Sequence, residues 1–184
     1  MTQPGSVVGD GRLRLFLALR LPDGVLDALQ EWQRAALTGG GRLLARDHLH
    51  VTLAFLGHRP AEELDGILAA LRASVREVRA FELEPLRYRE TRSVGMLVLA
   101  DPSGEAGRLA AGLHARLSEL GAYEPEARPW LPHVTVLRFG SPPGLSPPLP
   151  ALGRFAPSEA AAFLSRLHPA GAQYEVLDAV SLGG

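Results

Sequence analysis

The sequence predicts a mixed helix-and-strand fold of two related lobes, and three observations support this prediction. Segments with the order strand, helix, strand occur twice, over residues 13–57 and 94–140. The last strand of each copy carries a His-x-Thr-apolar tetrapeptide, HVTL at residues 50–53 and HVTV at residues 133–136. The interval from the first strand to the motif is also nearly equal in the two copies. Repetition of order, motif and spacing predicts a pseudo-two-fold axis that sets the two motifs opposite each other.

The first copy begins with an apolar run over residues 13–19, which indicates a strand. The Pro-Asp pair at residues 22–23 then opens a helix, because apolar side chains follow at helical spacing. Three glycines at residues 39–41 end this helix. The run HLHVTLAFLG over residues 48–57 forms the motif strand, and we expect Gly57 to close it.

The chain between the two copies predicts one more helix and a polar strand. Residues 61–78 place leucine, isoleucine and valine on one helical face. Residues 81–83 alternate and start a strand, and residues 87–92 predict either a polar turn or an edge strand. The second copy then opens with the strand VGMLVLA over residues 94–100 and a helix over residues 102–121.

The last third of the chain contains the second motif and two further strands. The run LPHVTVLRFG over residues 131–140 forms the second motif strand. Residues 141–150 hold five prolines and predict an extended, exposed loop. Strands around residues 163–167 and 174–177, separated by a turn, complete the predicted fold.

The motif residues point to acid–base chemistry. Side chains alternate along a strand, so residues i and i+2 share a face. Each motif therefore presents one imidazole and one hydroxyl together: His50 with Thr52, and His133 with Thr135. Two imidazoles that titrate near neutral pH, flanked by hydroxyl donors, are suited to acid–base work on an oxyanion. If the two strands face each other, all four side chains meet in one cleft.

Composition narrows the chemistry that such a cleft can use. The net charge is −1, so any binding of a polyanion depends on a local basic cluster. The chain has no cysteine, which excludes disulfides, thiolate nucleophiles and zinc–thiolate sites. All 19 basic residues are arginine, because the chain has no lysine. A ligase that forms a covalent lysyl-nucleotide intermediate is therefore excluded.

The chain is predicted to hold one domain. Residues 1–11 are polar and glycine-rich and predict a disordered lead, and residues 12–184 form a single bilobal domain. The apolar run over residues 13–21 contains two arginines and is too short for a membrane span. We expect a cytoplasmic protein with no membrane contact, and a monomer.

With these two motifs the chain resembles the 2H phosphoesterase superfamily, which is named for its two His-x-Thr-x motifs. It is most similar to the bacterial RNA 2′,3′-cyclic phosphodiesterase branch, long called 2′-5′ RNA ligases. The resemblance covers nearly the whole chain. The segments that carry it are RLFLALRLP, DHLHVTLAFLG, RPWLPHVTVLRF and SRLHPAGAQYEVL.

The resemblance implies an α+β fold whose antiparallel sheets line a central cleft. It implies hydrolysis of a terminal 2′,3′-cyclic phosphate on RNA to a 2′-phosphate, without metal or cofactor, and in principle the reverse ATP-independent 2′-5′ joining. By the same resemblance His50 is the proton donor and His133 the acceptor. Thr52 and Thr135 hold the phosphate oxygens, and Arg138 matches a basic residue common at its position.

The residues themselves leave several alternatives open. Pseudo-symmetry makes the acid and base roles of the two histidines interchangeable. His48 shares the predicted face of His50, and a His-x-His pair can bind zinc, although no third ligand at suitable spacing is present. The substrate could also be a small cyclic nucleotide or a 2′-5′ oligoadenylate. A non-catalytic nucleotide-binding module is the alternative from a different class.

Overall fold

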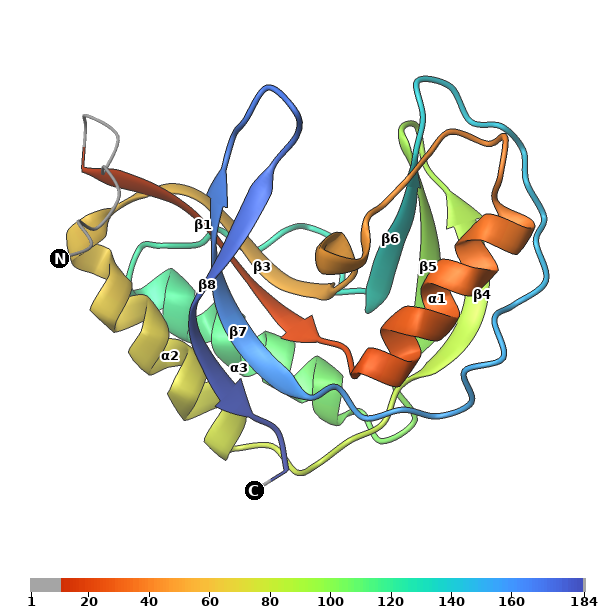
Figure 1. The fold of residues 1–184 in the computed structure, drawn as a ribbon. Coiled ribbons are helices and arrows are strands. Elements are labelled where there is room, and N and C mark those ends of the chain that lie inside the picture. The colour runs from red at the N-terminus through yellow and green to blue at the C-terminus, as the bar shows by residue number, and fades with distance from the viewer. Residues whose placement is uncertain (1–10, 184) are drawn as a thin grey trace, which may run out of the picture.

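The computed structural model describes residues 11–183, and within them the chain forms antiparallel strands, three α-helices and two 3₁₀ turns (Figure 1). The strands are β1 (Arg12–Arg20), β2 (Arg42–Leu43), β3 (Val51–Pro60), β4 (Glu84–Glu90), β5 (Val94–Ala100), β6 (His133–Arg138), β7 (Glu159–Arg166) and β8 (Gln173–Ser181). The helices are α1 (Asp23–Ala36), α2 (Leu64–Arg76) and α3 (Glu105–Glu119), with 3₁₀ turns η1 (Arg46–His48) and η2 (Ala61–Glu63). Apart from Gly11, the predicted disordered lead lies outside the described residues.

The strands form one sheet with two halves, in the order β4-β5-β6-β3-β1-β7-β8, and β2 adds to β6. Every pairing is antiparallel. β3 and β6 join the halves through a single residue pair within residues 11–183, Val51 with Val134. The predicted α+β class, with antiparallel sheet on both sides of a central division, is confirmed.

The helices of the two repeated units are exchanged between the halves. α1 follows β1 but packs on the half that contains β6, where Gln33 donates hydrogen bonds to the Leu44 and Val136 carbonyls. α3 follows β5 but packs beside α2 and β3 in the other half, where the His114 ring hydrogen-bonds the Leu53 carbonyl. Figure 1 shows α1 beside β4 and β5, and α2 with α3 on the far side of β1 and β7.

β1 is buried on both faces, which explains its unbroken apolar run. Leu15, Leu17 and Leu19 belong to the main core beneath the helices. Phe16 and Ala18 point the other way, into a second small cluster with side chains of β7. Phe16 of this cluster, and Tyr174 packed against it, line the cleft between the halves.

The element ends differ from the prediction at several places, of which three concern the segment between the two repeated units and its borders. β3 continues through Gly57 to Pro60, because Gly57, with φ of +66°, forms a bulge and does not end the strand. The predicted helix over residues 61–78 is a 3₁₀ turn followed by α2, Leu64–Arg76. Residues 84–90 form the edge strand β4, which resolves the alternative between turn and strand.

The proline-rich loop is mostly exposed, as predicted, but it is held at several points. The indole N–H of Trp32 donates to the Pro148 carbonyl at 2.7 Å. The backbone N–H groups of Gly144 and Leu145 donate to the Glu90 carboxylate. Between residues 11 and 183, none of the helices combines the length and apolar character that a membrane crossing requires.

Candidate active site

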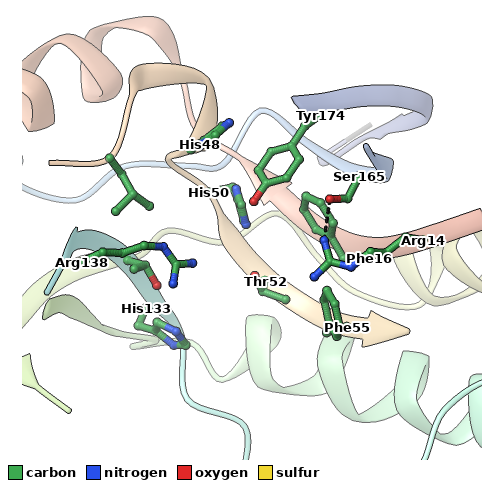
Figure 2. A pocket seen from close by; sticks show the side chains of 12 residues that line it. Arg14, Phe16, His48, His50, Thr52, Phe55, His133, Arg138, Ser165 and Tyr174 are labelled. Atoms are coloured by element: carbon green, nitrogen blue, oxygen red, sulfur yellow. Dashed lines mark hydrogen bonds between the residues drawn. The ribbon is translucent and has the colours of Figure 1, made fainter. Parts of the chain in front are cut away.

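All five residues predicted from the sequence line one cleft of about 180 Å³ between the two halves (Figure 2). They are His50, Thr52, His133, Thr135 and Arg138. The rest of the lining consists of Arg14, Phe16, Leu44, His48, Phe55, Ser165 and Tyr174. The facing arrangement follows from the sheet order, because β3 and β6 are neighbours and each carries one motif.

A bulge in β3 adds a third cleft residue to the first motif. Pairing with β1 skips Leu53, because Thr52 and Ala54 face consecutive residues of β1. An extra residue in a strand reverses the alternation beyond it. Leu53 and Ala54 are therefore both buried, and Phe55 returns to the cleft face with 52% of its surface exposed.

The second motif contains the equivalent bulge in β6. Pairing with β5 skips Val136, because Thr135 and Leu137 face consecutive residues of β5. Val136 and Leu137 are both buried, and the exposed Arg138 then shares the cleft face with Thr135. If i is the motif histidine, each motif strand thus presents residues i, i+2 and i+5 to the cleft. Simple alternation would turn residue i+5 away from it.

A backbone carbonyl fixes the orientation of the His133 imidazole. The His133 Nδ1–H donates to the Leu131 carbonyl at 2.8 Å, which leaves Nε2 for a ligand. The His50 ring lies close to the backbone of His48, which favours its charged form. The indole N–H of Trp130, just before the second motif, donates to the Thr52 carbonyl at 3.0 Å and ties the two motifs together.

Aromatic rings surround His50. Its ring stacks on Phe16 at a centroid distance of 5.0 Å, and Phe163 stacks on Phe16 at 4.8 Å and lies 6.1 Å from the ring of His50. Tyr174 meets the His50 ring edge-on at 5.9 Å and lies 4.4 Å from the ring of His48. Burial lowers the pKa of His50 to about 4, with smaller contributions from the neighbouring His48 and His133. Without a bound anion, His50 is therefore neutral at pH 7.

The cleft is a local basic cluster in a chain of nearly balanced charge. Its lining holds Arg14, Arg138 and three histidines, and none of the described residues that line it is an aspartate or a glutamate. Donors without competing carboxylates favour an anionic ligand. Over residues 11–183 no group of three histidine or carboxylate side chains is placed to hold a metal ion.

Several cleft residues were missed by the sequence interpretation. Arg14 and Phe16 lie in an apolar run, in which the alternation of the two strand faces cannot be recognised. The charge of Arg14 within this run was the one signal that its face is not part of the core. Ser165 and Tyr174 were taken as ordinary strand residues, but they are register partners on β7 and β8 and face the cleft together. Phe55 was hidden by the bulge.

Fold and paired motifs together define a 2H phosphoesterase. The chain belongs to the 2′-5′ RNA ligase superfamily, which it matches over residues 21–171.

The chain is similar over most of its length to two proteins of the same name. It is 35% identical to the RNA 2′,3′-cyclic phosphodiesterase of Thermus thermophilus, over 94% of this chain and 91% of that protein. It is 32% identical to the Escherichia coli protein of the same name, over 73% of this chain and 77% of the relative. The apo crystal structure of E. coli LigT superposes with a TM-score of 0.79 at 25% identity, covering 95% of this chain and all of LigT (100%).

Proposed function

We propose that this protein is an RNA 2′,3′-cyclic phosphodiesterase that hydrolyses a terminal cyclic phosphate to a 2′-phosphate. The observation that carries the proposal is the meeting of His50, Thr52, His133 and Thr135 in one cleft without a carboxylate. Two relatives that match most of the chain are named for this activity. Bound RNA ends are the partner that this chemistry requires.

The reaction needs two proton transfers on opposite sides of phosphorus. Water attacks in line with the bond to the 3′ oxygen, so one group takes the water proton and another protonates the departing alkoxide. In the proposed assignment His133 accepts the proton through Nε2, and His50 donates one to the 3′ oxygen. Thr52 and Thr135 donate to the non-bridging oxygens, and Arg138 neutralises their charge.

The environment of His50 suits a proton donor once the substrate is bound. Its low pKa makes the imidazolium a strong acid, but burial keeps the ring neutral at pH 7 until an anion binds. A phosphodiester anion between the motifs favours the charged form of His50. Substrate binding therefore raises the pKa of His50, and the ring takes up from solvent the proton that the leaving oxygen later receives.

The exposed ring of Phe55 supplies an aromatic surface at the edge of the cleft. Bases stack on such rings with little sequence preference. We therefore assign Phe55 to the nucleobase beside the cyclic phosphate.

The test uses an oligoribonucleotide that ends in a 2′,3′-cyclic phosphate, incubated with the protein in EDTA. The expected product carries a 2′-phosphate, identified by ³¹P NMR and by release with phosphatase. His50→Ala and His133→Ala should each lower the rate by about 10²-fold to 10⁴-fold. His58→Ala is the matched control, because His58 is an exposed histidine of β3 that does not line the cleft.

Binding of the oligonucleotide without turnover would favour a non-catalytic module instead. Full activity of either cleft variant would exclude the two-histidine mechanism.

The same assay with a 5′-hydroxyl RNA added tests the reverse joining, in which that hydroxyl replaces water as nucleophile. The protein is further proposed to act as a cytoplasmic monomer, which sedimentation of the purified protein and cell fractionation test.

A further inference from the structure

Arg14 is a cleft arginine for which the proposed chemistry has no use. Its Nη1–H donates to the Ser165 hydroxyl at 2.7 Å, and its guanidinium carbon lies 5.0 Å from the centroid of the Phe55 ring (Figure 2). Ser165 is 5% exposed, so a buried hydroxyl holds the guanidinium from one side. Among the described residues, no aspartate or glutamate pairs with Arg14, although many arginines elsewhere in the chain form ion pairs.

The sheet order separates Arg14 from the other cleft arginine. β3 lies between β6, which carries Arg138, and β1, which carries Arg14. Figure 2 shows the two guanidinium groups on opposite sides of the strand that carries Thr52. Arg138 lies at the end of β6, the strand whose His133 and Thr135 are assigned to the cyclic phosphate, and Arg14 lies beside Phe55. The cleft therefore offers positive charge at two separate places.

A cyclic phosphate carries one negative charge, and Arg138 with the two threonines already meets it. A second guanidinium, oriented by a hydroxyl and an aromatic ring, fits a second phosphate of the same ligand. Guanidinium groups bind phosphate through parallel N–H donors, and the bond to Ser165 uses one donor and leaves the others free. Arg14 and Phe55 are adjacent, so a nucleotide whose base stacks on Phe55 lies within reach of the Arg14 guanidinium.

We propose that Arg14 and Ser165 form a second phosphate subsite, which binds the phosphate on the 5′ side of the terminal nucleotide. The subsite makes the enzyme selective for RNA ends and 5′-phosphorylated nucleotides over nucleosides that carry only the cyclic phosphate. The inference rests on the proposed function. It is specific to a phosphate, because a role limited to holding Phe55 would affect all substrates equally.

The experiment compares kcat/KM for three substrates. They are adenosine 2′,3′-cyclic phosphate with a 5′-hydroxyl, the same nucleotide with a 5′-phosphate, and the dinucleotide ApA with a terminal cyclic phosphate. The wild-type protein should prefer the second and third by about tenfold to 100-fold, the range expected for charge-assisted hydrogen bonds. A preference for the dinucleotide assigns the subsite to the RNA chain, and a preference for the 5′-phosphate alone assigns it to mononucleotides.

Arg14→Gln should reduce these preference ratios to near one, and Ser165→Ala should reduce them partly because the guanidinium loses its support. Arg12→Gln is the matched control. Arg12 is an exposed arginine two positions earlier on β1, where it donates to the His58 carbonyl outside the cleft, and its loss should keep the ratios. For the dinucleotide, the slope of log(kcat/KM) against log salt concentration should also become shallower by about 0.7 in Arg14→Gln.

Equal wild-type rates on all three substrates would overturn the subsite. An Arg14→Gln variant that loses the same factor on each substrate would also overturn it, because the arginine would then act through Phe55 or the fold. Thermal unfolding of each variant separates a loss of structure from a loss of the ratio. If the wild-type protein hydrolyses none of the three, the proposed function itself is wrong, and this outcome is distinct from turnover without preference.

Discussion

At the scale of single residues, His50 and His133 hold equivalent positions in their motifs but have different surroundings. Phe16 and Tyr174 enclose the ring of His50, whereas none of the aromatic contacts within residues 11–183 involves His133. Burial among these rings disfavours the charged imidazolium of His50 and lowers its pKa. The asymmetry distinguishes two histidines that the sequence alone leaves interchangeable.

The lowered pKa of His50 should respond to charge in the cleft. In the empty protein its ring should titrate near the value of about 4 that burial imposes. Inorganic phosphate should raise this pKa, because an anion stabilises the imidazolium, and His133→Asn should raise it by removing a neighbouring positive charge. NMR titration of the histidine ring signals, assigned with His50→Gln, measures both effects. An unchanged His50 midpoint with saturating phosphate would mean that the anion binds elsewhere.

The same pKa predicts how stability depends on pH. The ordinary histidine value of 6.5 applies to the unfolded chain, and the folded value is about 4. Between these pH values the unfolded chain binds a proton that the folded protein does not, so the free energy of unfolding decreases as pH falls. By pH 4.5 the loss from His50 should be about 2 kcal/mol relative to pH 7. Urea unfolding at both pH values should show a correspondingly smaller loss in His50→Gln, and equal losses in both proteins would contradict the burial.

At the scale of elements, the sequence predicts which residues share a face only where a strand is regular. His50 with Thr52, and His133 with Thr135, follow from alternation, and the structure places all four in the cleft. Phe55 does not follow from alternation. The bulge at Leu53 depends on the pairing of β3 with β1, and no local signal in the sequence encodes that pairing.

Arg138 illustrates the complementary limit. Simple alternation from His133 turns it away from the cleft, so its assignment depended on the family resemblance. The bulge in β6 supplies the physical reason that the resemblance lacked. Gly57 shows the same effect in reverse, since a glycine that signals the end of a strand is here a bulge within one.

Gly41 should be essential to the strand that carries Arg138. A Cβ at this position would lie 2.4 Å from the Arg138 carbonyl oxygen, and its φ of +151° disfavours other residues. Gly41→Ala should therefore lower the free energy of unfolding by about 1–3 kcal/mol, and the displaced Arg138 should lower activity on a cyclic phosphate. Gly140→Ala is the control, because its Cβ would meet nothing within 4 Å. Equal urea midpoints and activities for the two variants would contradict this role.

At the scale of the whole molecule, the two halves share little sheet but interlock through their helices. β3 and β6 meet at Val51 and Val134, and α1 and α3 each cross to the half opposite their own strands. The repeat in the sequence predicted the two units and their symmetry. It did not predict the exchange, because each amphipathic helix carries an apolar face that fits either half.

Trp130 provides a hydrogen bond between the halves at the site itself, and its loss should reduce both activity and stability. Trp130→Phe keeps the ring and removes only the bond from the indole N–H to the Thr52 carbonyl. A neutral hydrogen bond contributes about 0.5–1.5 kcal/mol, so if the two motifs lose their relative position, kcat/KM should decrease by about twofold to tenfold. Steady-state rates and urea unfolding on the same preparation measure the two effects.

Trp32→Phe is the matched comparison, because it removes an equivalent bond from an indole N–H to a backbone carbonyl, at Pro148. That bond holds the proline-rich loop on α1, and neither Trp32 nor Pro148 lines the cleft. The two variants should therefore lose similar stability, but only Trp130→Phe should lose activity. If both variants lose activity alike, then the position of the motifs depends on overall packing and not on the bond between the halves. If neither does, the backbone pair at Val51 and Val134 and the exchanged helices are sufficient to hold the two histidines in place.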